Sequence, residues 1–277
     1  MAIELGKINS LEIVKEVDFG LYLDGGEEGE ILLPARYVPY QYEIGQKLDV
    51  FVYLDNEERL VATTLKPYVQ VGEFAYLQVS WVNQYGAFLD WGLMKDLFCP
   101  FREQRRKMEV GYSYIIHAHI DEESFRIMAS AKVEKYLSND MPPYQPDDEV
   151  DLLVWQRTDL GYKVIIENKY QGLVYENQVF QQLEIGKRLK GYIMQVREDG
   201  KVDVALQRSG RQQTLDFADT LLNYMERNGG RCYLHDKSPA EEIYERFKVS
   251  KKVFKKAVGD LYKRRLIEIT DSGLRLL

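Results

Sequence analysis

The first 210 residues repeat one pattern of apolar and polar positions three times. Each repeat opens with a glycine followed by a short alternating segment, at residues 20–23, 86–89 and 161–164. A second glycine follows 25 residues later and opens another strand-like segment, and a short apolar segment closes each repeat. Alternation with a period of two is typical of half-buried strands, and short strands separated by turn residues predict a small barrel or sandwich.

Each repeat holds about five short strands, which is the strand number of an OB-fold barrel. Lys66-Pro67 and the proline-rich run 142–146 mark boundaries between repeats. From Gln213 the apolar period changes to that of a helix. We therefore predict a mainly β protein with a C-terminal α+β domain. The predicted domains are three tandem OB-fold barrels at residues 1–66, 67–141 and 145–210, followed by a winged-helix domain at residues 211–277.

The last quarter of the chain has the element order of a winged-helix domain. A helix from Gln213 precedes a short strand at 232–234, a helix that starts at Ser238, a helix at 251–265 and a hairpin with its turn at 271–273. The pairs 253–254, 257–258 and 261–262 form the expected inner face of the 251–265 helix. Its other face carries Lys251, Lys252, Lys255, Lys256, Lys263 and Arg264.

The basic helix is the element with which winged-helix domains usually meet polyanions. Charge supports this assignment, because the net charge of −7 is unevenly distributed along the chain. Residues 1–66 carry 6 basic and 13 acidic residues, whereas residues 211–277 carry 14 basic and 10 acidic residues. We expect the basic helix to contact phosphates, with a merely solvated lysine face as the alternative. The acidic first barrel is expected to bind nucleic acid worst.

Strand alternation also predicts which side chains face outward from each barrel. In the second barrel Phe88 and Phe98 should lie side by side on the outer face, and in the third barrel Lys163 should lie beside Tyr175. Exposed aromatic rings form stacking platforms for nucleobases, and a neighbouring lysine can meet a phosphate. The alternative is that these rings pack against a neighbouring barrel. The residues expected to point inward include Phe19, Tyr85 and Leu160, which precede the opening glycines.

Few residues have the pattern of a catalytic or metal site. His117 and His119 are a close pair that would share one face of a strand, but no third ligand of matching pattern accompanies them. We find no phosphate-binding glycine loop and no zinc-type cysteine pairing. We therefore expect no enzyme activity, no catalytic residues, no metal and no cofactor.

Bulk properties narrow the class of protein further. The chain has no run of about eighteen apolar residues and no secretory signal pattern, so we expect a cytoplasmic protein without membrane contact. Cys99 and Cys232 belong to different predicted domains and are expected to stay reduced.

The phrase Gly-Ala-Phe-Leu at 86–89 resembles the S1 RNA-binding domain, as does Gly-Leu-Val-Tyr at 172–175. Three such units before a winged helix resemble the bacterial conserved virulence factor B family. The phrases that carry the match are Asn-Lys-Tyr-Gln-Gly-Leu-Val-Tyr-Glu-Asn at 168–177 and the run from Ser250 to Lys263. By position Phe88, Phe98 and Tyr175 match the RNA-facing aromatic residues of S1 domains. Two departures are Lys163 after Gly161 and Leu32 in the first repeat.

The resemblance implies S1-like barrels that bind single-stranded RNA, with the winged helix taking part, and a role in post-transcriptional regulation. Two other classes of function stay open. A winged-helix regulator of duplex DNA would need base-reading side chains, whereas the basic helix here is nearly all lysine. A non-catalytic scaffold would use the first barrel to dock on a ribosome or an RNA-processing protein.

Overall fold

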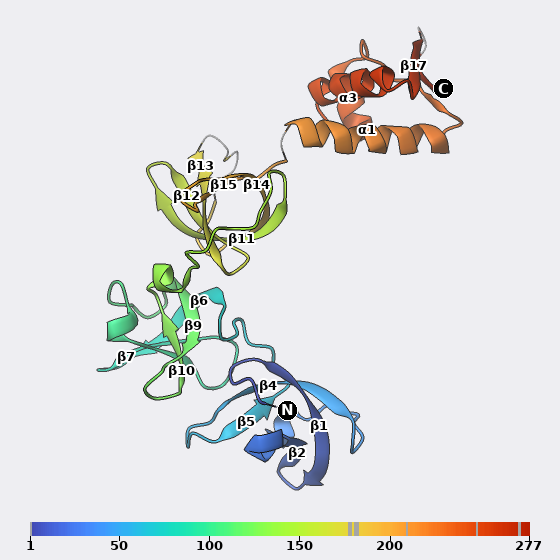
Figure 1. Ribbon diagram of the computed structural model, residues 1–277. Helices are drawn as coiled ribbons and strands as arrows, with labels where there is room; N and C mark the ends of the chain where they lie inside the picture. The colour runs from blue at the N-terminus through green and yellow to red at the C-terminus, as the bar shows by residue number, and fades with distance from the viewer. Residues whose placement is uncertain (1, 177–178, 180–182, 209, 248, 271–272) are drawn as a thin grey trace. The chain divides into compact units, whose positions relative to one another are not determined.

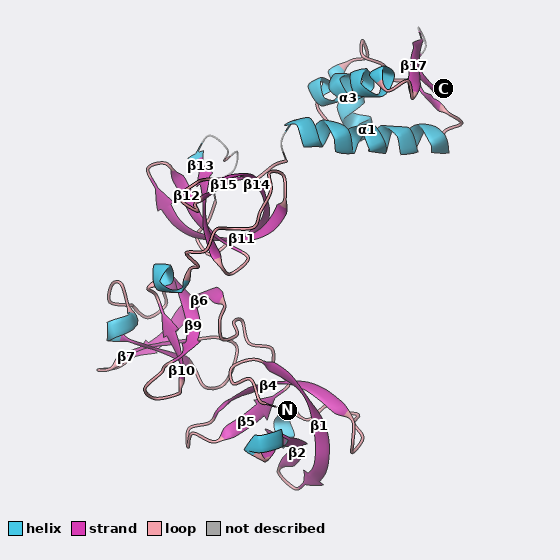
Figure 2. Cartoon of the chain, in the orientation of Figure 1, coloured by secondary structure: helices cyan, strands magenta, loops and turns pink. Residues whose placement is uncertain are grey.

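The computed structural model describes residues 2–176, 179, 183–208, 210–247, 249–270 and 273–277. Contacts divide the chain into two compact units, residues 1–141 with 151–189 and residues 142–150 with 190–277. The predicted fold class is confirmed, because three five-stranded barrels precede a helical domain with a small sheet (Figures 1 and 2). The domain boundaries at residues 66, 141 and 210 stay predictions. The predicted turn at 271–273 and Asn177 fall partly or wholly outside the described residues.

The three barrels have the same strand order, so that the third strand of each repeat lies beside the fifth. The first barrel contains β1 (Ile8–Val17), β2 (Gly20–Asp24), β3 (Glu30–Pro34), β4 (Lys47–Leu54) and β5 (Leu60–Thr63). The second contains β6 (Phe74–Val82), β7 (Gly86–Leu89), β8 (Leu97–Pro100), β9 (Ser113–Ile120) and β10 (Ile127–Ser130). The third contains β11 (Glu149–Thr158), β12 (Gly161–Ile166), β13 (Tyr170–Tyr175), β14 (Arg188–Val196) and β15 (Val202–Ala205).

The opening glycine of each repeat is required where two neighbouring strands approach closely. A Cβ atom on Gly20 would lie 2.1 Å from the carbonyl oxygen of Leu33, and one on Gly161 would lie 2.1 Å from that of Val174. Both glycines also have positive φ angles, 150° and 140°, which side-chain-bearing residues rarely adopt. The repeated glycine therefore marks the start of the second strand in each barrel.

The inward orientation expected for Phe19, Tyr85 and Leu160 is wrong. Their side chains are 56%, 65% and 64% exposed. Each residue lies just before the strand, which begins at the glycine, so the alternation of the strand does not extend to it. The carbonyl of Phe19 instead accepts a hydrogen bond of 2.9 Å from the amide of Ala35.

The first and second barrels share one hydrophobic core. Phe51 of β4 packs edge-on against Trp91, which follows β7, with ring centroids 5.5 Å apart. Both rings belong to a buried cluster that also includes Val69 between the barrels. The amide of Val71 donates to the carbonyl of Gly6 at 2.9 Å. The linker between the two barrels is therefore packed and hydrogen-bonded.

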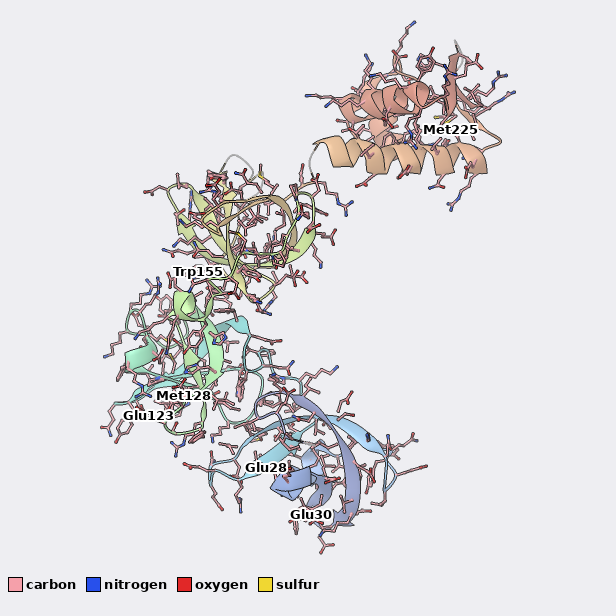
Figure 3. All side chains as sticks on the ribbon, viewed as in Figure 1. Glu28, Glu30, Glu123, Met128, Trp155 and Met225 are labelled. Atoms are coloured by element: carbon pink, nitrogen blue, oxygen red, sulfur yellow. The ribbon has the colours of Figure 1, made fainter. Side chains whose placement is uncertain are left out.

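The second and third barrels meet at a smaller apolar junction. Phe74 of β6 and Trp155 of β11 are both buried in one cluster, and Trp155 is labelled in Figure 3. The amide of Phe74 donates to Oδ1 of Asn168 at 3.2 Å, and Arg188 donates to the carbonyl of Phe74. Asn168 has a left-handed φ of 53°, a conformation that asparagine tolerates better than most residues. The phrase at 168–175 thus contributes to the junction between barrels.

The C-terminal domain has the predicted winged-helix order. It contains α1 (Gly210–Arg227), β16 (Arg231–Cys232), α2 (Ala240–Phe247), α3 (Lys251–Lys263), β17 (Ile267–Thr270) and β18 (Gly273–Leu276). Ser250 caps α3 by accepting a hydrogen bond from the amide of Val253. The expectation that Tyr262 packs inward is wrong, because its side chain is 55% exposed while Leu261 is fully buried. None of the described helices combines the length and apolarity needed to cross a bilayer.

Candidate nucleic-acid interface

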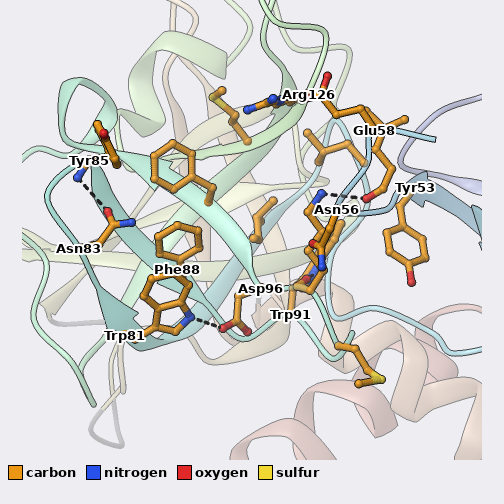
Figure 4. A pocket seen from close by; sticks show the side chains of 17 residues that line it. Tyr53, Asn56, Glu58, Trp81, Asn83, Tyr85, Phe88, Trp91, Asp96 and Arg126 are labelled. Carbon is orange, nitrogen blue, oxygen red and sulfur yellow. Dashed lines mark hydrogen bonds and ion pairs between the residues drawn. The ribbon is translucent and has the colours of Figure 1, made fainter. Parts of the chain in front are cut away.

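Three aromatic side chains form a continuous row across the second barrel. Trp81 of β6 is paired with Phe88 of β7, and Phe88 is paired with Phe98 of β8. Residues paired across neighbouring strands share one face of a sheet. The Trp81 and Phe88 rings are parallel within 3°, with centroids 3.7 Å apart, and the Phe88 and Phe98 centroids are 4.9 Å apart. We call these three residues the aromatic ladder (Figure 4).

The outermost ring of the ladder is both exposed and held in place. Trp81 is 45% exposed, and its indole Nε1 donates to Oδ2 of Asp96 at 2.9 Å. Tyr85, which the sequence pattern placed inside the barrel, instead lies near the ladder in Figure 4. Phe88 and Phe98 are half-buried. The hydrogen bond to Asp96 and the contact with Phe88 thus hold the indole ring of Trp81 in one orientation, which suits stacking of another flat ring on it.

Sequence reasoning placed Phe88 and Phe98 together but missed Trp81. Strict alternation puts Trp81 on the same face as Val79, which is buried in the barrel core. The strand register shifts between Val79 and Trp81, and a β-bulge of this kind turns the following side chain to the other face. The first and third barrels have a register shift at the equivalent point of their first strands. Because the bulge does not alter the pattern of apolar and polar residues, the sequence carried no signal for Trp81.

A cavity of about 700 Å³ lies beside the ladder, within the range typical of ligand sites. Its lining includes all three ladder residues, Met94 and Met128 of the second barrel and Tyr53 of the first. Lys95 also lines it, and burial lowers the pKa of Lys95 while the nearby Asp55 opposes that shift. The Lys95 ammonium donates to the carbonyls of Leu54 and Asp55 at 3.0 and 2.8 Å.

The corresponding rows of the other barrels are not aromatic throughout. In the first barrel Lys15 and Leu32 flank Tyr22. In the third barrel Gln156 and Leu173 flank Lys163.

Tyr175 lies two residue pairs further along the third barrel. It is paired with Gly161, so it shares a sheet face with Lys163 but does not occupy the position that Phe98 has in the second barrel. The Lys163 ammonium lies 5.1 Å from the centre of the Trp155 ring. The structure therefore brings Lys163 and Tyr175 to one face of the sheet.

The basic face of α3 is the second candidate surface. Lys252, Lys255, Lys256 and Lys263 are exposed, and no ion pair to them occurs within the described part of the chain. Arg264 pairs with Asp260 at 3.2 Å, and Lys251 donates weakly to the carbonyl of Lys237 at 3.4 Å. Tyr262 is exposed on the same helix. Four lysines therefore remain available for phosphate groups.

The loop at 102–107 carries four basic residues, but two of them are engaged in ion pairs and are less available for phosphate groups. Arg102 pairs with Asp121 at 2.7 Å, and Arg105 pairs with Glu134. Among the described residues, no group of three or more His, Cys, Asp or Glu side chains is arranged to hold a metal ion.

Two domain families match parts of the chain. The S1 domain matches residues 5–65, and the CvfB-like winged helix domain matches residues 219–276. The uncharacterized protein YitL of Bacillus subtilis strain 168 is 28% identical over 265 residues, covering 93% of this chain and 89% of that protein. Conserved virulence factor B of Staphylococcus saprophyticus is 23% identical over 282 residues, covering 98% of this chain and 94% of that protein.

One solved structure is similar to this chain in sequence. The crystal structure of a multidomain protein with nucleic acid binding domains from Streptococcus pneumoniae TIGR4 is 23% identical, with a TM-score of 0.40. The match covers 99% of this chain and 98% of that one. The S1 and winged-helix domains matched here support nucleic-acid binding.

Proposed function

This chain belongs to the conserved virulence factor B family, and from that premise we propose that it binds single-stranded RNA and regulates gene expression after transcription. The aromatic ladder of the second barrel stacks unpaired bases. The basic face of α3 contacts phosphates. Lys163 and Tyr175 of the third barrel supply a weaker contact, because Lys163 lies between Gln156 and Leu173 and not between aromatic residues.

The observation that carries this proposal is the stacked row of Trp81, Phe88 and Phe98 beside a cavity. Single-stranded nucleic acid exposes the faces of its bases, whereas a duplex keeps them stacked inside. A flat aromatic surface therefore favours single strands over duplexes. The lysine face adds affinity without sequence preference, because phosphates carry no sequence information.

Replacing Trp81 with alanine tests the proposal directly. Base–aromatic stacking contributes about 1–3 kcal/mol per base, so we expect Trp81→Ala to weaken RNA binding by about 5- to 150-fold. The ring is 45% exposed, so its removal should leave the barrel folded. The measurement is fluorescence anisotropy with labelled single-stranded RNA, single-stranded DNA and duplex DNA of equal length.

Tyr40→Ala is the matched control, because this aromatic side chain is 100% exposed and does not line the cavity. It should bind RNA as the wild type does. Tighter binding of duplex DNA than of RNA would favour the DNA regulator instead. Equal binding by wild type and Trp81→Ala would show that the ladder is not the site. No binding of any probe at low salt would leave a protein scaffold as the function.

A further inference from the structure

The cavity beside the aromatic ladder has a second wall that comes from the first barrel. Leu54, Asn56 and Glu58 of the β4–β5 hairpin line it together with the ladder. Lys95 of the second barrel donates to the carbonyls of Leu54 and Asp55, and Arg126 of the second barrel pairs with Glu58. With the shared core beneath, these contacts hold the hairpin at a defined place opposite the ladder (Figure 4).

The hairpin carries two side chains, Asn56 and Glu58, with hydrogen-bonding groups that have no partner among the described residues. Asn56 and Glu58 are exposed, and the amide of Asn56 has no hydrogen bond within the described residues. The ion pair to Arg126 uses Oε1 of Glu58, and the described residues provide no partner for Oε2. A carboxylate accepts up to about four hydrogen bonds, and a primary amide both donates and accepts. The edge of a nucleobase offers matching N–H and C=O groups.

The backbone at Glu58 adopts a conformation that favours glycine. Glu58 has a left-handed φ of 64° at the fourth position of the turn that starts at Asp55. The equivalent turn of the third barrel, from Arg197 to Lys201, has Gly200 there with φ of 76°. The corresponding turn of the second barrel has Phe125 with φ of 57°, so two of the three barrels carry a side chain here at the cost of local strain.

We propose that the β4–β5 hairpin of the first barrel is the second wall of the RNA site, where Asn56 and Glu58 hydrogen-bond to the edge of a base stacked on the ladder. This inference rests on the proposed function of the ladder. It gives the acidic first barrel a role in reading bases, because a carboxylate repels phosphates yet accepts hydrogen bonds from base N–H groups.

The test compares Glu58→Gly and Asn56→Ala with the wild type, using short single-stranded RNAs of each base and an abasic strand of equal length. We expect each variant to weaken binding of the base-containing strands by about three- to tenfold. Binding of the abasic strand should stay the same or improve. Glu58→Gly should keep or raise the thermal midpoint, because glycine relieves the strain at that position.

Glu57→Gln is the matched control, since Glu57 carries the same charge next to Glu58 but does not line the cavity. Loss of a charge that merely repels RNA would strengthen binding in both Glu57→Gln and Glu58→Gly, and that result would overturn the inference. Unchanged binding by Glu58→Gly and Asn56→Ala would also overturn it. If Trp81→Ala still weakens binding in that case, the ladder remains the RNA site and only the role of the hairpin fails.

Discussion

His117 shows how a single side chain makes the stability of the second barrel depend on pH. Its ring is buried on β9 between Phe74 and Tyr136, with ring centroids 4.7 and 4.1 Å away. Burial, with a smaller effect from His119, lowers the pKa of His117 to about 4. Within the described residues, Nδ1 of His117 has no hydrogen-bond partner. The folded protein therefore holds this imidazole in its neutral form.

We expect acid to destabilise the protein through His117. The unfolded imidazole has a pKa of about 6.5, so the unfolded state binds more protons as the pH falls from about 6.5 towards 4. His117 makes its full contribution to the free energy of unfolding above about pH 6.5. About 1–3 kcal/mol of this free energy is lost as the pH falls from about 6.5 to about 4. Urea unfolding at about pH 7.5 and about pH 4.5 measures the loss. His117→Leu should reduce this loss.

At the scale of elements, α3 combines a buried face with a face of exposed lysines. Val253, Phe254 and Leu261 pack into the domain core. Because these residues lie on one face of the helix, the lysines on the other face point towards solvent. Replacing Lys252, Lys255, Lys256 and Lys263 together with alanine should weaken RNA binding and make it less sensitive to salt. Each lost phosphate contact lowers the slope of log K against log salt by about 0.7 for a single strand.

The slope is measured by titrating RNA across a salt series. For four contacts we expect it to fall by about 3 in magnitude. Lys66→Ala with Lys132→Ala removes two exposed lysines outside the helix and should leave the slope near that of the wild type. An unchanged slope in the α3 variant would mean that its lysines are only a solvated face.

At the scale of the whole molecule, we expect the buried cluster shared by the first two barrels to make them unfold together, although the first barrel also has a core of its own. Trp91 is 3% exposed and contacts Phe51 of the other barrel. Trp91→Ala should destabilise the protein by about 3–5 kcal/mol, because it leaves a large cavity in that core. Hydrogen exchange should then show lost protection in both barrels, with α1 and α3 unaffected. Loss confined to the second barrel would show that the barrels unfold independently.

Residues 20–23, 86–89 and 161–164 show how much of the fold was predictable. Strand alternation and the repeated glycines depend on neighbours along the chain, so three barrels could be inferred from them. The errors at Phe19, Tyr85 and Leu160 arose because the alternation begins at the glycine and not before it. Phe88 and Phe98 could be placed together because each lies between buried neighbours on its strand.

The sequence by itself determined the order of domains, the outward face of β7 and β8, and the lysine face of α3, since each follows from a local period. Only the tertiary structure decided that Trp81 joins the ladder, that Asn168 secures a junction, and that Glu58 faces a cavity. A bulge changes which face a side chain occupies without changing the residue pattern. Contacts between segments far apart in the chain depend on packing, which no local period encodes.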